Sequence, residues 1–143
     1  MNEFEKCLQR RGLVRFERAG PDVIEAELRS AREDLADVGL MLEHARWKRA
    51  TITGYYAMFH AGRALVLDKG YAEKSHYCLL VAFRELFGDS DEGRELASAL
   101  ERARQLRENA DYHSEFSEDG ARAVSSVALR FVAFAEKALG AGS

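Results

Sequence analysis

The stretch ATITGYYAMFHAGRALVL, residues 50–67, decides the fold, because only His60 and Arg63 within it can carry a charge near neutral pH. An apolar run of this length is too long for a strand and predicts a helix that is apolar on every side. Such a helix must be surrounded by other helices, and small residues give these neighbours room to approach: Gly54, Ala57, Ala61, Gly62 and Ala64. We therefore expect the central helix of a bundle, with Tyr56 and Phe59 buried.

The composition indicates one folded, all-α domain. The chain has 143 residues, of which 47% are hydrophobic and 31% are charged, so it is too apolar to be disordered. A single proline and few β-branched runs favour long helices and leave no sheet to place. We predict one domain over residues 1–143, in which an N-terminal arm (1–19) precedes an up-and-down helical bundle (20–140). The expected elements are four long helices plus a short N-terminal helix.

The sequence predicts a cytoplasmic protein. Residues 50–67 fall short of the roughly twenty apolar residues that a membrane span needs, and an ionisable residue lies in their middle. The N-terminal residues MNEFEKCLQRR lack the apolar core of a secretion signal. Cys7 and Cys78 are far apart in the sequence and match no zinc spacing, so we expect two reduced thiols. The net charge of −3 excludes a protein that is basic overall, and a nucleic acid would have to bind a local patch.

Capping residues divide the rest of the chain into helices. Pro21 suits the first position of a helix. Three serines are expected to cap later helices and three glycines to end helices: Ser75, Ser90, Ser117, Gly70, Gly88 and Gly140.

The residues Lys74, Ser75 and His76 lie at the expected start of a helix, where free backbone N–H groups favour an anion such as phosphate. The alternative is that Ser75 only caps the helix and Lys74 is solvated. Glu73 and His76 also have the Glu-x-x-His spacing of di-iron bundles. No second half of such a site exists, because no Glu stands three residues before any other histidine: His44, His60 or His113. We therefore expect neither a metal nor a cofactor.

A second polar cluster lies near the expected end of a long helix: Arg102, Arg104, Arg107, Asp111, Tyr112 and His113. A guanidinium and an imidazole are the groups that metal-free RNA cleavage requires, one to hold charge on the phosphate and one to move protons. The alternative is that Arg104 with Glu108, and Arg107 with Asp111, form ordinary surface ion pairs. On one straight helix Arg107 and His113 would lie about 120° apart. Either the helix bends before His113, or a second subunit completes the site.

Four segments together resemble the HEPN domain family, in its subgroup of small stand-alone bacterial and archaeal proteins. They are YYAMFHA (55–61), GY (70–71), KSH (74–76) and RENADY (107–112), and the resemblance covers nearly the whole chain. It implies an up-and-down helical bundle that is usually dimeric. Many members are ribonucleases or toxins, often encoded beside a minimal nucleotidyltransferase that acts as the antitoxin.

The resemblance also implies site residues. The family's catalytic motif is an Arg, four to six residues and a His, set across the dimer interface, and Arg107 with His113 has this spacing. Arg107 would hold the phosphate and His113 would move the proton. The remaining candidates for binding phosphate or RNA are Arg104, Lys74, Ser75 and His76. Asp111 and Tyr112 are the predicted supporting residues.

Two functional hypotheses follow. The first is a homodimer that binds RNA or a nucleotide and acts as a metal-independent endoribonuclease toxin. The second is a non-catalytic HEPN module that binds a nucleotidyltransferase partner. The Arg107 and His113 spacing favours the enzyme. The net acidity of the chain favours the module, as does Glu108, which stands where active members often have Asn, Asp or His.

Overall fold

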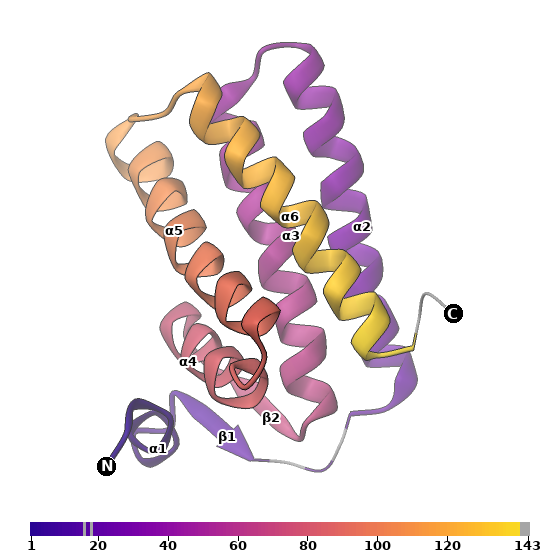
Figure 1. Cartoon of the computed structure of the whole chain (residues 1–143), viewed down its shortest axis with the longest axis vertical. Helices are drawn as coiled ribbons and strands as arrows, with labels where there is room; N and C mark the ends of the chain where they lie inside the picture. Colours follow the sequence, from indigo (N-terminus) through magenta and orange to yellow (C-terminus); the bar gives the residue numbers. More distant parts are fainter. Residues whose placement is uncertain (16, 18, 141–143) are drawn as a thin grey trace.

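The apolar run forms the middle helix of a bundle in the computed structural model, which describes residues 1–15, 17 and 19–140. This helix is α3 (Trp47–Asp68). It packs against α2 (Pro21–Glu43), α4 (His76–Phe87), α5 (Asp91–His113) and α6 (Glu118–Ala138), as Figure 1 shows. A helix with small and apolar residues on all sides is stable only when enclosed in this way.

The prediction of an all-helical bundle is confirmed in its class and corrected in its elements. The long helices α2, α3, α5 and α6 have 21 to 23 residues, and α1 (Glu3–Gln9) is the short N-terminal helix. The 12-residue α4 is a further helix beyond the predicted four long and one short. All three serine caps are confirmed, because each hydroxyl accepts a backbone N–H of its own helix.

A small sheet contradicts the expectation that the chain has none. Strand β1 (Leu13–Arg15) pairs antiparallel with β2 (Tyr71–Glu73), with Leu13 opposite Glu73. Each strand has only three residues, too few for the alternating pattern by which a sequence reveals a strand. The sheet joins the N-terminal arm to the segment between α3 and α4.

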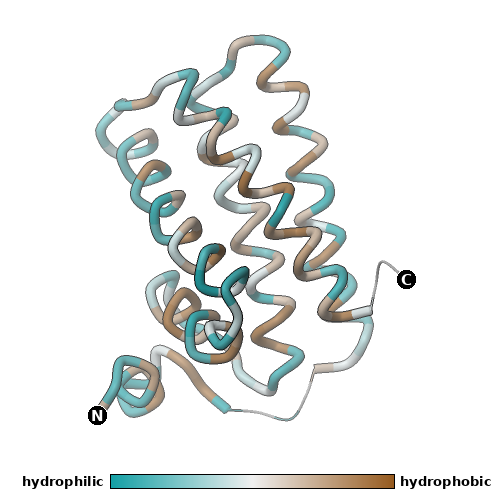
Figure 2. Tube along the Cα trace, in the orientation of Figure 1, coloured by the Kyte–Doolittle hydropathy of each residue, from teal (hydrophilic) through white to brown (hydrophobic). Residues whose placement is uncertain are grey.

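The core is built around aromatic side chains of α3, α4 and α6. Tyr55, Phe83 and Phe131 are fully buried, and Phe59 is 5% exposed. Tyr56 is only partly buried, so the expectation for α3 holds for Phe59 and is too strong for Tyr56. Figure 2 shows hydrophobic residues recurring along α4 and α6, whereas α5 is more hydrophilic. That polar helix carries the candidate arginines.

The two cysteines form a disulfide, and the expectation of two reduced thiols is wrong for this structure. Cys7 on α1 and Cys78 on α4 have Cα atoms 5.8 Å apart although 71 positions separate them in the sequence. The separation along the chain misled the prediction, because folding lays α1 against α4. A hydrogen bond of 2.6 Å from the Tyr77 hydroxyl to the Glu3 carboxylate joins the same two helices.

No helix of the described residues is long and apolar enough to cross a membrane.

Replacing Phe59 with Ala should lower the free energy of unfolding by about 3–5 kcal/mol, because the change leaves a cavity beside the central helix. Chemical denaturation followed by circular dichroism measures this. The matched control is Leu129→Ala on α6, where the side chain is 58% exposed and the change should stay within about 0.5 kcal/mol. Equal effects at the two positions would contradict the enclosed position of α3.

Removing the disulfide by replacing both Cys7 and Cys78 with Ser should cost about 2–4 kcal/mol of stability, since the bond closes a long loop in the unfolded chain. Denaturation with and without dithiothreitol measures the effect. The wild-type protein should lose stability on reduction, and the double variant should be insensitive to it. A wild-type protein that unfolds identically in both conditions would show that the bond does not form in solution.

Candidate functional site

Aromatic residues of α3 meet one histidine of α4 and one arginine of α5. The Arg107 Nη2 atom donates a 2.7 Å hydrogen bond to the Tyr56 hydroxyl. The Arg107 guanidinium carbon lies 5.3 Å from the ring centre of Tyr56 and 6.0 Å from that of Tyr55, within reach of cation–π attraction. His76 and Phe59 complete the group. We call these five residues, Tyr55, Tyr56, Phe59, His76 and Arg107, the Arg107 cluster.

The His76 ring is held on several sides. Its Nδ1 atom lies 2.7 Å from the Tyr55 hydroxyl, in hydrogen-bonding distance. The ring stacks on Phe59 with centres 4.4 Å apart and meets Tyr56 edge to face at 6.0 Å. Because His76 is the first residue of α4, whose cap Ser75 orders the first turn, both the backbone and the side chain are fixed.

The electrostatics of the Arg107 cluster favour an anionic ligand. Burial lowers the pKa of His76, and the positive charges of Arg107 and Arg104 lower it further, so the imidazole is uncharged at neutral pH. Burial raises the pKa of the Tyr55 phenol far above its ordinary value, so the hydroxyl keeps its proton. Neither His76 nor Tyr55 therefore opposes the arginine charge, and the carboxylate paired with it is that of Asp111.

The Arg107 guanidinium is only partly satisfied by the protein. Its side chain is 14% exposed, and its Nε atom is buried without a hydrogen-bond partner among the described residues. The Asp111 carboxylate lies 3.5 Å from Nη2, and the Tyr112 ring centre lies 5.4 Å from the guanidinium carbon. Most buried polar groups are hydrogen-bonded, and a guanidinium with unused N–H groups is suited to carboxylate or phosphate oxygens.

The other residues predicted from the sequence lie around this cluster. Asp111 and Tyr112, which were predicted as supporting residues, both contact Arg107. Arg104 forms a 3.5 Å ion pair with Glu108 and lies close enough to lower the pKa of His76. Lys74 and Ser75 are exposed just before α4, and the Ser75 hydroxyl is occupied by the backbone N–H of Cys78.

The predicted pair of Arg107 and His113 is not joined within one chain. His113 is exposed and is the last residue of α5, which runs unbroken from Asp91. Six positions on a helix correspond to about 9 Å along the axis. The described side-chain contacts include none between the two residues. The pair remains a prediction that requires a second subunit.

Sequence reasoning missed that α3 contributes to the site. It treated Tyr56 and Phe59 as core residues only and gave Tyr55 no part. The available signal was the adjacent pair of tyrosines in an otherwise apolar helix, because a buried phenol hydroxyl usually finds a hydrogen-bond partner.

A second group of charged residues, which pair with one another, also contacts Phe59. Arg63 of α3 donates two hydrogen bonds to the Glu73 carboxylate, of 2.8 and 3.0 Å, and its guanidinium lies 4.7 Å from the Phe59 ring centre. His60 Nδ1 lies 2.8 Å from the Glu27 carboxylate. Burial alone would raise the pKa of Glu27, but the hydrogen bonds and charges of His60 and Arg63 together lower it. These groups satisfy one another, which suits a structural role.

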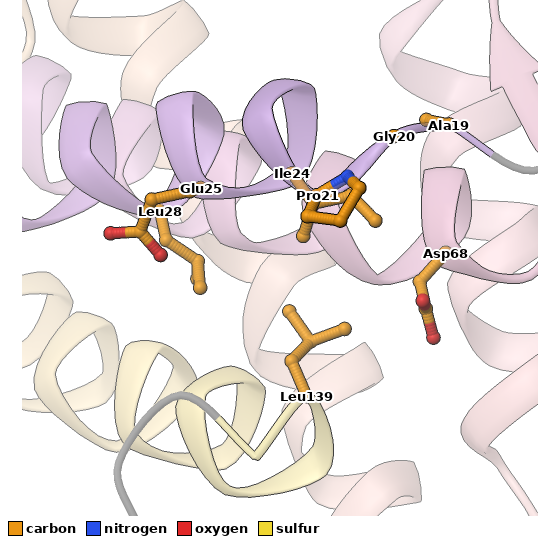
Figure 3. A pocket seen from close by; sticks show the side chains of 8 residues that line it. All are labelled: Ala19, Gly20, Pro21, Ile24, Glu25, Leu28, Asp68 and Leu139. Carbon is orange, nitrogen blue, oxygen red and sulfur yellow. The ribbon is translucent and has the colours of Figure 1, made fainter.

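The structure also contains a pocket that lies away from the Arg107 cluster. A pocket of about 610 Å³ lies between the start of α2, the end of α3 and Leu139, and none of the predicted site residues lines it (Figure 3). Within the described residues, no group of three or more His, Cys, Asp or Glu side chains could hold a metal ion.

The chain is similar to known proteins over most of its length. The model of the HEPN domain family matches residues 24–139. A UPF0332 protein of Archaeoglobus fulgidus is 36% identical over 123 residues, which cover 82% of this chain and 96% of that protein. A UPF0332 protein of Thermotoga maritima is 35% identical over 103 residues, covering 70% and 78% respectively. A Methanocaldococcus jannaschii protein whose name calls it a putative toxin is 29% identical over 118 residues, covering 81% and 88%.

Proposed function

The chain belongs to the HEPN domain family, and from this premise we propose that it binds RNA at the Arg107 cluster and cleaves it without a metal ion. In this proposal it is a cytoplasmic homodimer and the toxin of a pair whose other member is a minimal nucleotidyltransferase. The toxin role draws support from the name of the M. jannaschii relative. The nucleotidyltransferase partner rests on the resemblance to the HEPN family, whose members are often encoded beside such a protein.

The observation that carries the proposal is that Arg107 is held in a fixed position with its hydrogen bonding incomplete. Its guanidinium is largely buried, is held in place by the Tyr56 hydroxyl, and has an Nε–H that no described residue accepts. A guanidinium that is already positioned needs little reorganisation when a phosphate reaches its exposed part. The buried Nε–H shows that the protein itself leaves the guanidinium incompletely hydrogen-bonded. The nearby Arg104 adds a second positive charge, which favours a phosphodiester, and the carboxylates of Asp111 and Glu108 are each paired with one of the two arginines.

The proposed reaction is attack of the ribose 2′-oxygen on the adjacent phosphorus. A bond forms between this oxygen and phosphorus, and the bond from phosphorus to the 5′-oxygen breaks. His113 takes the proton of the 2′-hydroxyl as a general base and returns a proton to the leaving 5′-oxygen. Arg107 holds the charge that builds on the non-bridging oxygens. The products are a 2′,3′-cyclic phosphate and a 5′-hydroxyl.

A specific observation favours the second hypothesis, the non-catalytic module. Arg104 with Glu108, and Arg107 with Asp111, are ion pairs of 3.5 Å along α5. In that reading the arginines stabilise the helix, and the surface of the bundle binds the nucleotidyltransferase. Glu108 also brings a negative charge next to the proposed phosphate site.

Cleavage of a short single-stranded RNA by the purified protein should persist in EDTA and give cyclic phosphate and 5′-hydroxyl ends. His113→Ala should lower the rate by a factor on the order of 10² to 10⁴ and leave RNA affinity nearly unchanged, because an acid-base group acts in the transition state. Arg107→Ala should lower both rate and affinity. Glu108→Asn should raise the rate, because it removes an anion from the phosphate site.

The control for these variants is His44→Ala, since His44 is an exposed histidine at the end of α2 and should leave cleavage unchanged. An inactive wild-type protein, or cleavage that survives His113→Ala, would favour the non-catalytic module instead.

The protein should be a dimer in which Arg107 of one subunit works with His113 of the other. Light scattering should give twice the chain mass at all but the lowest concentrations. Mixing the inactive variants Arg107→Ala and His113→Ala should restore about a quarter of the wild-type rate, since half the exchanged dimers carry one intact composite site. A monomer at every concentration, or a mixture that stays inactive after subunit exchange, would contradict the composite site.

A further inference from the structure

The two ring nitrogens of His76 have different surroundings. Nδ1 lies 2.7 Å from the Tyr55 hydroxyl. The described residues provide no hydrogen-bond partner for Nε2, and Nε2 is not among the buried atoms that lack one. His76 itself is partly exposed. Nε2 is therefore the nitrogen that solvent or a ligand can reach.

The Tyr55 hydroxyl determines which nitrogen carries the proton. Tyr55 is 1% exposed, and the only partner that the described residues offer its hydroxyl is Nδ1 of His76. If Nδ1 carried the ring proton, the phenol proton would be buried without an acceptor, which costs free energy. With the phenol as donor and Nδ1 as acceptor, both groups are satisfied. An uncharged imidazole then carries its proton on Nε2.

The charges that face His76 keep the ring neutral. Burial lowers the pKa of the His76 ring, and the charges of Arg107 and Arg104 from α5 and Arg63 from α3 lower it further, while Glu73 of β2 raises it. Glu73 is bound through both carboxylate oxygens by Arg63, so its charge is largely compensated. A neutral ring with an exposed Nε2–H can donate a hydrogen bond, but it cannot serve as a general base at that atom.

We propose that Tyr55 is a positioning residue that holds His76 with its proton on Nε2, so that this N–H and the guanidinium of Arg107 together receive one phosphate group of RNA. The two donors share Tyr55 and Tyr56 as neighbours, because Arg107 lies over both rings and His76 packs against both. A phosphate offers several acceptor oxygens, and two fixed donors of different type would set its orientation.

This inference rests on the RNA-binding part of the proposed function and divides the work of the two histidines. His113 moves protons, whereas His76 donates a hydrogen bond and keeps its proton. Binding and turnover should therefore respond differently to changes at the two positions.

The state of the ring can be measured in the free protein by nitrogen-15 NMR of the histidine side chains. At pH 7, His76 should be uncharged with the proton on Nε2. Tyr55→Phe should weaken the preference for this tautomer, so that a larger fraction of the rings carries the proton on Nδ1, with folding checked by circular dichroism. The matched control is Tyr77→Phe, because Tyr77 follows His76 in the sequence but its hydroxyl binds Glu3 and not the His76 ring. That variant should leave the His76 resonances unchanged.

A short single-stranded RNA then tests the ligand role. It should shift the Nε2–H resonance of His76 in the wild type. His76→Gln keeps an N–H donor near the position of Nε2 and should retain RNA affinity within about threefold, whereas His76→Ala should lose about tenfold or more. His113→Gln should keep the affinity and lose the cleavage rate.

Each outcome has one meaning. A charged His76, a proton on Nδ1, or a tautomer that Tyr55→Phe leaves unchanged would overturn the positioning role. An Nε2–H resonance that RNA does not move, or a loss of affinity in His76→Gln as large as in His76→Ala, would overturn the phosphate contact. If these results are as expected but no RNA is cleaved, the nuclease reaction is wrong and the binding site stands.

Discussion

The burial of α3 on all sides is the constraint on which the rest of the structure depends. The apolar surface of residues 50–67 is covered by the three other long helices and by α4. The same helix carries Tyr55, which is fully buried, and Tyr56, which is partly buried, and a hydroxyl removed from water needs a hydrogen-bond partner. Tyr56 finds Arg107 on α5, and Tyr55 finds His76 on α4. A packing requirement thus brings a guanidinium and an imidazole together.

The two polar groups around Phe59 differ in how far they are satisfied. In the first group, Arg63 and Glu73 bind each other through two hydrogen bonds, and His60 lies against Glu27. In the Arg107 cluster, Arg107 has one hydrogen bond to the Tyr56 hydroxyl, a looser ion pair with Asp111 and a buried Nε without a partner among the described residues. A closed network stabilises a fold, whereas an unfinished one is suited to a ligand. This contrast is why we assign function to the Arg107 cluster.

The sequence predicts the helices well because their signals are local. The apolar run of α3, the caps at Ser75, Ser90 and Ser117, and Pro21 at the start of α2 all act within a few residues, and each is found in the structure. The two short strands leave no such signal.

The features that sequence reasoning missed join residues far apart in the chain. The pairing of Cys7 with Cys78, and of Tyr55 with His76, depends on how α1, α3 and α4 meet. Arg107 and His76 were both named beforehand, but in two separate clusters. Spacing along α5 suggested His113 as the partner of Arg107. Packing instead brings His76 near it within one chain. The pairing of Arg107 with His113 stays a prediction that requires a second subunit.

The central claim, that Arg107 receives a phosphate of RNA, is tested most directly by the salt dependence of RNA affinity. The logarithm of the affinity of the wild type for a short single-stranded RNA should fall linearly with the logarithm of salt concentration. Arg107→Gln should weaken binding and reduce the slope by about 0.7, the value for one lost phosphate contact on a single strand. Arg130→Gln, which alters an exposed arginine paired with Glu95 on the surface of α6, should change neither. An Arg107→Gln variant with the wild-type affinity and slope would contradict the account.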